Sequence, residues 1–399
     1  MRKIDRWAGI PITMVISVLL WLKKTLLFQR RKLPDPSRTL FIELSEMGSA
    51  IIVDPAMRKL IKEVEADVYF AIFRSNYKSL NFLNTVVQKN IFTMRSDNLI
   101  HMAVDVFKFI IWCRKNRITT VIDLELFSRF TAILCAFSGA TARVGFTNLH
   151  DEGLYRGTII NYPVRYNPHV HMSVNFMSLV QTTLGLNDTP YPTTPVDPAD
   201  LKLAKAEITK KETDVVKSKI RILYPPWRDE KLILINANAS DLLPQRRWLP
   251  EYFAWVSRKI LELYPEVLLI ATGSPEEREF VQKVVDAAGN ARFVNSAGVF
   301  DFEELVPLYS ISKLMLTNDS GPAHFAAVTD LKVFVLFGPE TPALYLPMGN
   351  AEAIYLGLPC SPCVSAANHR KTTCETRPCM TGIQPEMVFE RIDKFLSGS

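Results

Sequence analysis

The stretch that decides the fold is Leu316-Thr-Asn-Asp-Ser-Gly-Pro-Ala-His-Phe-Ala-Ala327, an apolar strand that runs directly into a Gly-Pro helix start. Ser320 and Asp319 can cap this helix, and Pro322 suits its first turn, where a backbone N–H would have no partner. The free N–H groups and the helix dipole favour an anion such as a diphosphate, which His324, one turn further on, is close enough to face. Taken alone, the same pattern fits an ordinary capped helix of an α/β protein.

Two further polar loops follow predicted strands of the same sheet. Asn-Ala-Asn-Ala-Ser at 236–240 precedes Gln-Arg-Arg-Trp-Leu-Pro at 245–250, and the two arginines can neutralise a phosphate. Thr-Gly-Ser at 272–274 forms a small-residue turn that admits a nucleotide near the backbone. Because the carboxyl ends of parallel strands meet at one sheet edge, the three loops together predict a site for a phosphate-bearing ligand. The candidate binding residues are Asn238, Ser240, Arg247, Gly273, Glu277, Asp319, Ser320, Gly321, Pro322 and His324, with Glu276 as the alternative to Glu277 for ribose hydroxyls.

Strands and helices are expected to alternate through the rest of the chain, as in βαβ units. Short β-branched or aromatic runs predict strands at 39–44, 68–73, 120–124, 142–145, 232–236, 267–271, 292–294, 314–317 and 332–337. A proline-rich stretch with a Lys/Glu-rich helix at 199–219 separates the two series and is typical of a linker. The fold class is therefore α/β, with two doubly wound domains in tandem.

The predicted organisation has five parts. They are a basic and apolar segment at 1–38, a first domain at 39–188, a linker at 189–230, a second domain at 231–382 and a C-terminal helix at 383–399.

Charge is concentrated at the amino-terminal end. The 399 residues carry a net charge of +6, yet residues 1–38 alone hold nine Lys or Arg against Asp5 and Asp35. The remaining residues therefore carry a net charge of about −1. A nucleic-acid-binding protein usually spreads its basic charge over a folded face, so no nucleic-acid partner is expected. A lipid surface is the expected anionic partner.

Residues 7–22 form an uncharged run between Trp7 and Trp21, followed by Lys23, Lys24 and a basic cluster at 30–32. As a helix of about 24 Å this run is short for a bilayer core of about 30 Å, which favours an interfacial or re-entrant anchor over a straight span. The flanking Trp and basic residues suit headgroups of anionic lipid and place the bulk of the chain in the cytoplasm. A buried core helix and a secretory signal are the alternatives, although no small-residue cleavage site follows.

The motif at 318–327, together with Phe-Gly-Pro-Glu-Thr-Pro at 337–342 and Arg-Trp-Leu-Pro at 247–250, resembles the signature of glycosyltransferase family 9, the ADP-heptose:lipopolysaccharide heptosyltransferases. The turn at 41–56 is similar to that family's acceptor-side motif. The resemblance implies a GT-B fold, in which two Rossmann-like domains face each other and the final helix commonly crosses back to the first domain. It also implies an inverting, metal-independent transfer, in agreement with the absence of any Asp-x-Asp triplet from the sequence.

One position departs from the family's pattern. Where similar proteins have Met-Gly-Asp, with the Asp as the usual general base, this chain has Met-Gly-Ser ending at Ser49. A serine hydroxyl is a poor base without an activating partner. Glu46 is the nearest carboxylate and the preferred candidate, and Asp54 is a second. An ordinary turn or capping residue is the alternative role for Glu46.

Four cysteines, Cys360, Cys363, Cys374 and Cys379, are spaced in a way that could hold a structural zinc ion. Reduced thiols in a loop are the alternative, and no cofactor is expected for catalysis. Cys113 and Cys135 lie in apolar helical patterns and are expected in the core.

The resulting hypothesis is a membrane-associated glycosyltransferase at the cytoplasmic face of the bacterial inner membrane, anchored by residues 7–32. The expected partners are a nucleoside-diphosphate sugar, by resemblance ADP-heptose, and a lipid-linked glycan such as lipopolysaccharide core. The Ser at position 49 leaves open a non-catalytic GT-B scaffold that binds a nucleotide sugar or glycan. A sugar-nucleotide epimerase on the same fold is the third possibility.

Overall fold

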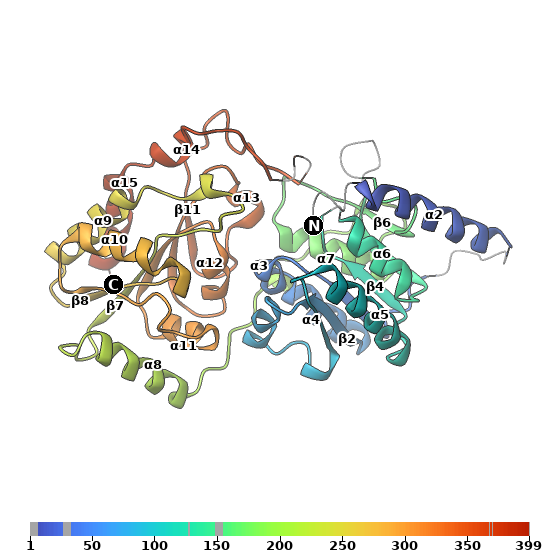
Figure 1. Ribbon diagram of the computed structural model, residues 1–399, viewed down its shortest axis with the longest axis horizontal. Helices are drawn as coiled ribbons and strands as arrows, with labels where there is room; N and C mark the ends of the chain where they lie inside the picture. Colours follow the sequence, from blue (N-terminus) through green and yellow to red (C-terminus); the bar gives the residue numbers. More distant parts are fainter. Residues whose placement is uncertain are drawn as a thin grey trace. The chain divides into compact units, whose positions relative to one another are not determined.

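The computed structural model describes residues 7–26, 33–126, 128–147, 155–366, 368 and 370–398. The chain divides into two compact units, Met1–Lys202 and Leu203–Ser399 (Figure 1). Each unit contains a six-stranded parallel sheet with helices packed on it. The prediction of two doubly wound α/β domains in tandem is therefore confirmed. The predicted basic cluster at 30–32 lies outside the described residues.

The first unit has the strand order β3-β2-β1-β4-β5-β6. Its strands are β1 (Arg38–Ile42), β2 (Asp67–Phe73), β3 (Ile91–Met94), β4 (Thr120–Asp123), β5 (Ala142–Thr147) and β6 (Tyr162–Arg165). Its helices are α2 (Gly9–Leu26), α3 (Met47–Ile52), α4 (Asp54–Val64), α5 (Leu99–Lys115), α6 (Arg129–Phe137) and α7 (Met172–Thr183). Helices α5 and α6 cover the sheet face that carries Leu40 and Ile42, whereas α4 and α7 pack on each other and on β2, β4 and β5.

The second unit repeats this topology with the order β12-β11-β10-β7-β8-β9. Its strands are β7 (Lys231–Asn236), β8 (Val267–Ala271), β9 (Phe293–Asn295), β10 (Leu314–Asn318), β11 (Lys332–Leu336) and β12 (Ala351–Ile354). Its helices are α8 (Lys210–Leu223), α9 (Pro250–Leu263), α10 (Arg278–Ala288), α11 (Leu305–Ser310), α12 (Gly321–Ala326), α13 (Pro342–Tyr345), α14 (Pro378–Thr381) and α15 (Pro385–Ser397). In both sheets the order in which successive strands are added reverses at the first strand, so β1 lies between β2 and β4, and β7 lies between β8 and β10.

Two helices differ from the sequence-based expectation. The helix expected at 199–219 begins only at Lys210, because Thr209 and Glu212 form a capping box that fixes its first turn. It buries Val216 and Ile220 and packs against α11 in the second unit. The C-terminal helix α15 packs against α9, so it lies within the second unit as well.

Helix α2 is docked to the first unit by one face. Ile16 packs with Ala132 of α6 and with Ile159, and the N–H of Thr158 donates to the hydroxyl of Ser17 at 3.0 Å. The opposite face carries apolar side chains that remain exposed, namely Ile12, Met14, Val15, Val18, Leu19, Trp21 and Leu22. Over the part of the chain that the structure describes, none of the helices is both long enough and apolar enough to cross a membrane.

The docking of α2 depends on Gly157, whose φ is +63° and whose position leaves no room for a side chain. A Cβ there would lie 2.0 Å from the Ser17 Oγ and 3.1 Å from the Thr13 carbonyl oxygen. We therefore expect Gly157→Ala to combine backbone strain with a steric clash against α2 and to lower the free energy of unfolding by about 2 to 4 kcal/mol.

The matched control is Gly289→Ala, because Gly289 has a similar φ of +67° with no atom within 4 Å of the added Cβ. This variant should lose only the backbone part, about 1 to 2 kcal/mol. Chemical denaturation gives both values, and amide hydrogen exchange in α2 should increase in the first variant alone. Equal losses in the two variants would contradict a tight α2 contact.

Candidate functional site

In the first unit the strand order reverses between β1 and β4, so the loops that follow these two parallel strands lie side by side at the carboxyl edge of the sheet. Ligands of doubly wound sheets bind at this place. The loop after β1 brings Glu43 and Glu46, and the loop after β4 brings Glu125. The structure therefore gathers three carboxyl groups at the expected binding edge.

Backbone groups of the β1 loop hold two of these carboxyl groups. The Glu125 Oε1 accepts from the N–H groups of Leu44 and Ser45, at 3.2 and 3.1 Å, and from the Ser45 hydroxyl at 2.8 Å. The Glu43 Oε1 accepts from the N–H groups of Ser45 and Glu46, at 3.3 and 3.1 Å. These bonds fix the loop that positions Glu46.

Glu43 and Glu125 also hydrogen-bond each other. Burial raises the pKa of Glu43 well above its ordinary value, and the nearby charges of Glu125 and Glu46 raise it further. Burial raises the pKa of Glu125 as well. Two adjacent carboxyl groups, one buried and one half-buried, cannot both ionise cheaply, so the pair retains a proton at a pH where an exposed glutamate has lost it.

The β1 loop ends in α3, where Glu46 occupies the N-cap position without a side-chain capping bond. Its Oε2 instead accepts a hydrogen bond from the Ser49 hydroxyl at 2.9 Å. Ser49 is almost fully buried, and so is Asp54, whose carboxylate accepts a bond from Thr85. The Glu46 side chain thus does not cap α3. Asp54, the first residue of α4, is held by its hydrogen bond with Thr85.

The raised pKa of Glu43 makes a prediction about stability. The folded state keeps the Glu43 proton more tightly than the unfolded state, so its contribution is complete below the ordinary pKa of 4.5 and declines as pH rises toward the folded-state pKa. Glu43→Gln mimics the protonated acid. We expect the variant to lose less free energy of unfolding than the wild type as pH rises above 4.5, by up to about 1.4 kcal/mol per pH unit until the folded-state pKa is reached.

Denaturant titrations at several pH values measure this difference directly. The control is Glu390→Gln, which changes an exposed carboxylate on α15 and should leave the pH dependence as in the wild type. Parallel pH profiles of the Glu43 variant and the wild type would mean that Glu43 is ionised in the folded protein.

In the second unit the corresponding edge lies between β7 and β10, and the fully buried amide of Asn318 ties its loops together. The Asn318 Oδ1 accepts from the N–H of Trp248 at 2.9 Å. Its Nδ2 donates to the carbonyl oxygens of Ala237 at 2.9 Å and of Asn238 at 3.3 Å. One side chain therefore fixes the loop after β7, the Arg-Trp segment and the end of β10.

A second set of buried polar contacts links the adjacent strand ends. The Asn236 side chain donates to the Thr272 hydroxyl at 3.1 Å and accepts from the Thr317 hydroxyl at 3.3 Å. The Ser320 hydroxyl lies 3.3 Å from the Thr317 hydroxyl. Ser320 does occupy the N-cap of α12, but its side chain makes no capping bond, so the predicted capping role is replaced by this contact with β10.

The two adjacent arginines have different partners. Arg247 donates to the Ala239 carbonyl oxygen at 2.6 and 2.9 Å and pairs with Asp241. Arg246 pairs with Asp319 at 3.4 Å, and its buried Nε makes no hydrogen bond within the described part of the chain. Both arginines were sequence-based candidates for the phosphate, and Arg247 was preferred. The contacts of Arg247 hold a loop, whereas Arg246 lies beside Asp319 at the start of α12.

The remaining candidates are distributed around this edge. Asp319 and His324 are buried, and Pro322 lies in the first turn of α12 as predicted. Asn238 and Ser240 accept bonds from N–H groups of their own loop. The Glu277 carboxylate accepts from the Ser274 N–H at 2.8 Å and completes a capping box, beside Gly273. Gly321 begins α12.

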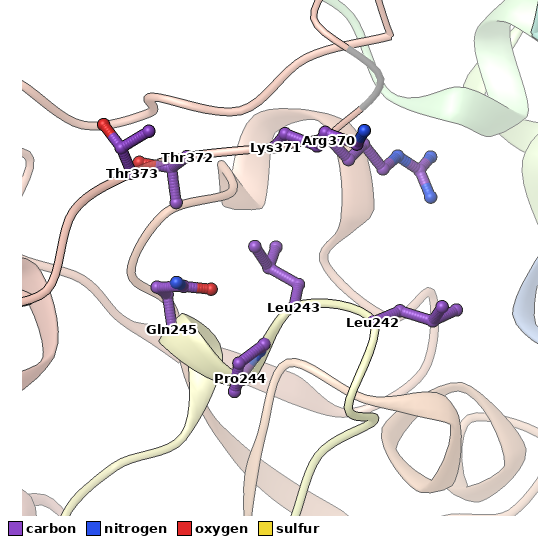
Figure 2. Close-up of a pocket in the computed structure, with 8 residues that line it drawn as sticks. All are labelled: Leu242, Leu243, Pro244, Gln245, Arg370, Lys371, Thr372 and Thr373. Carbon is purple, nitrogen blue, oxygen red and sulfur yellow. The ribbon is translucent and has the colours of Figure 1, made fainter. Parts of the chain in front are cut away.

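A pocket of about 560 Å³ opens beside this edge (Figure 2). Its lining comes from the segment before Arg246 and from a C-terminal loop, and consists of Leu242, Leu243, Pro244, Gln245, Arg370, Lys371, Thr372 and Thr373. Figure 2 shows the Leu243 side chain pointing toward the segment that carries Lys371 and Thr372. The guanidinium of Arg370 contacts the buried carboxylate of Glu340 at 3.5 Å and lies over the ring of Tyr345.

All six cysteines are free thiols, and Cys113 and Cys135 are in the core as expected. Of the other four cysteines, Cys379 packs into the core of the second unit, where burial raises the pKa of its thiol. The Cys363 thiol contacts the Thr372 hydroxyl. No three His, Cys, Asp or Glu side chains in the described ranges are grouped so as to hold a metal ion. The described residues thus give the predicted zinc site no support.

Sequence reasoning missed Glu43, Glu125 and Asn318, and it ranked Arg246 below Arg247. Glu43 follows directly on β1, Glu125 comes two residues after β4, and Asn318 ends β10. These strands adjoin the point where the strand order of each sheet reverses. That position was the available signal, because polar residues at such strand ends are buried only where a loop covers them.

Comparison with known proteins agrees with this geometry. A sequence profile described as glycosyltransferase family 9 (heptosyltransferase) matches residues 108–373. Lipooligosaccharide heptosyltransferase 2 of Campylobacter jejuni serotype O:6 is 29% identical over 172 residues, which cover 41% of this chain and 51% of that protein. The match thus spans about half the length of that relative.

Two solved structures of Escherichia coli proteins have the same fold. ADP-heptose lps heptosyltransferase II superposes with a TM-score of 0.68 at 18% identity, covering 90% of this chain and 99% of the other. Heptosyltransferase WaaC with ADP-2-deoxy-2-fluoro heptose gives 0.60 at 14% identity, with the same two coverages.

The two Rossmann-like sheets with this topology thus define a GT-B protein. Because the profile match extends over more than half of the sequence, the chain belongs to glycosyltransferase family 9.

Proposed function

We propose that this protein is an inverting, metal-independent glycosyltransferase that transfers heptose from ADP-heptose to a lipid-linked saccharide such as lipopolysaccharide core. Family membership and the heptosyltransferase relatives support the reaction class. The solved neighbour that contains an ADP-heptose analogue supports the donor. In this proposal the first unit binds the acceptor and the second binds the donor.

The observation that carries the donor site is the position of Arg246. Its buried Nε makes no hydrogen bond in the described chain, and its guanidinium lies beside Asp319 at the start of α12. A buried donor without a partner is costly, and a ligand oxygen would remove that cost. The diphosphate of a nucleotide sugar supplies such an oxygen, and the guanidinium stabilises the charge that develops as the diphosphate leaves.

For the acceptor step we assign the general base to Glu46. Its carboxylate takes the proton of the acceptor hydroxyl while that oxygen bonds to the anomeric carbon. The bond between this carbon and the diphosphate oxygen breaks at the same time, and the nucleoside diphosphate departs with the electron pair. Ser49 donates to Glu46 and orients its carboxylate, and the protonated pair of Glu43 and Glu125 leaves Glu46 as the group that receives the proton.

Purified full-length protein with a panel of ADP-, UDP- and GDP-sugars and a membrane glycolipid extract tests this assignment. The wild type should release one nucleoside diphosphate, with ADP-heptose as the preferred donor. Glu46→Gln should lower the transfer rate by about a hundredfold or more while donor binding, measured by calorimetry, is retained. Unchanged transfer by the Gln variant would remove Glu46 from the mechanism.

The two arginines provide a separate test of the donor site. Arg246→Ala should weaken ADP binding by about ten- to a hundredfold, because a charge-assisted bond to the diphosphate is lost. Arg247→Ala should have the smaller effect on affinity, since its bonds go to Ala239 and Asp241. If the order of the two effects is reversed, the diphosphate binds at Arg247.

A second candidate function is a non-catalytic scaffold that binds a nucleotide sugar in polysaccharide assembly. The Ser at position 49 favours it, since the family's usual carboxylate is replaced there by a buried hydroxyl. Donor binding without turnover by the wild type, with the glycolipid extract present, would support this function over transfer.

We also propose attachment to the cytoplasmic face of the inner membrane through α2. Its exposed face is apolar over most of its length, Trp21 lies near its end, and Lys23 follows. One face packed on protein and one exposed apolar face suit a helix that lies in the plane of the interface.

A further inference from the structure

Helix α5 carries a row of exposed apolar side chains that the proposed reaction does not use. Ile100, Val104, Phe107 and Ile111 follow one another at intervals of four, three and four residues and therefore share one side of the helix. Ile100 is 77% exposed and Phe107 is 66% exposed. The buried side, with Phe109 and Cys113, already packs on the sheet, so this second apolar row has no role in the core.

The row belongs to the same layer of the first unit as α2. Helix α6 contacts both α2 and α5 and lies between them (Figure 1). Most of the exposed large apolar side chains of the described residues are on these three helices. Rows of exposed apolar side chains on neighbouring helices mark a docking site, whereas single apolar residues scattered over a surface need no explanation.

The charged side chains on these three helices are mostly basic. Helices α2, α5 and α6 together contain five Lys or Arg besides Arg129, and Asp105 is their one acidic residue. Asp105 is buried and forms a bidentate pair with Arg95, at 2.8 and 2.7 Å, so it presents no negative charge to a partner. On α5, Lys108 and Lys115 are exposed beside the apolar row. The chain beyond residue 38 is otherwise close to neutral.

We propose that the exposed row of α5 is a second membrane contact, which docks the first unit on an anionic bilayer together with α2. Apolar side chains that enter the acyl boundary beside lysines that meet lipid phosphates are what such a surface requires. One helix leaves the unit free to rotate about its axis. Two helices on one layer hold the whole layer against the bilayer.

The proposal also suggests how a lipid-linked acceptor would arrive, a point that rests on the proposed function. Helix α5 follows β3, so its first turns, with Ile100 and Val104, lie toward the carboxyl edge of the sheet. Glu46 lies at that same edge. A saccharide whose lipid stays in the bilayer would therefore meet the acceptor loop from the docked layer.

Co-sedimentation of the full-length protein with vesicles tests the proposal. The variant is Phe107→Ser with Ile111→Ser, and the matched control is Val215→Ser with Ile222→Ser, two exposed apolar residues of α8 in the second unit. On vesicles of phosphatidylglycerol and phosphatidylethanolamine, the α5 variant should lose about tenfold or more in partition coefficient, and the control should match the wild type. Lys108→Glu with Lys115→Glu should weaken binding to these vesicles at low salt and have less effect at high salt.

Other outcomes would overturn the proposal. Wild-type partitioning by the α5 variant would exclude a lipid contact there. If the wild type is a dimer in sedimentation velocity without lipid, and the α5 variant is a monomer, the occupant of this surface is a second copy of the chain.

Donor turnover in solution, measured on the same preparations, distinguishes a failure of the proposed glycosyltransferase function from a failure of the proposed membrane contact. Failure of transfer with normal vesicle binding would affect the proposed function alone. If the wild type transfers sugar normally and the α5 variant binds vesicles as the wild type does, the membrane contact of α5 is excluded and the proposed function stands.

Discussion

The side-chain amide of Asn318 is the interaction on which the second unit's site depends. Three backbone groups meet at its oxygen and nitrogen, namely the N–H of Trp248 and the carbonyl oxygens of Ala237 and Asn238. They come from the two ends of the connection between β7 and α9, about seventy to eighty residues before Asn318, and each would otherwise be buried without a partner. The Arg-Trp segment is fixed at Trp248, which places Arg246 beside Asp319. Because Asn318 is the last residue of β10, the rigid sheet fixes the positions of the loops that would bind a ligand.

The first unit achieves the same result with carboxyl groups. Glu43 and Glu125 follow neighbouring strands, and both accept hydrogen bonds from backbone N–H groups of the β1 loop. Keeping a proton between them avoids two adjacent negative charges beside Glu46. Ser49 takes part in this acidic cluster as a hydrogen-bond donor to Glu46.

Sequence reasoning recovered the architecture because the central strands are buried on both faces and read as apolar runs. The strands it did not predict, β3, β6 and β12, all lie at sheet edges, where one side lacks a strand and burial is incomplete. Proline in β6 weakened its pattern further, and proline is tolerated there because the position is an edge.

The candidate site was recovered less completely, for a different reason. The motif at 318–324 is local, so its residues could be named from the sequence. The pairing of Glu43 with Glu125 joins loops about eighty residues apart, and the local sequence of one loop does not predict its contact with the other. Arg246 and Arg247 are adjacent and chemically identical, and only backbone geometry decides which one faces Asp319.

Each unit is formed from one continuous stretch of the chain, because α15 stays with the second unit. The first sheet can therefore be completed while the second is still being synthesised, and neither sheet waits for a strand from the other. Two such units are separate cooperative blocks, so heat or denaturant need not unfold them in a single all-or-none step. The apolar layer of α2, α5 and α6 would be in place from the moment the first block folds.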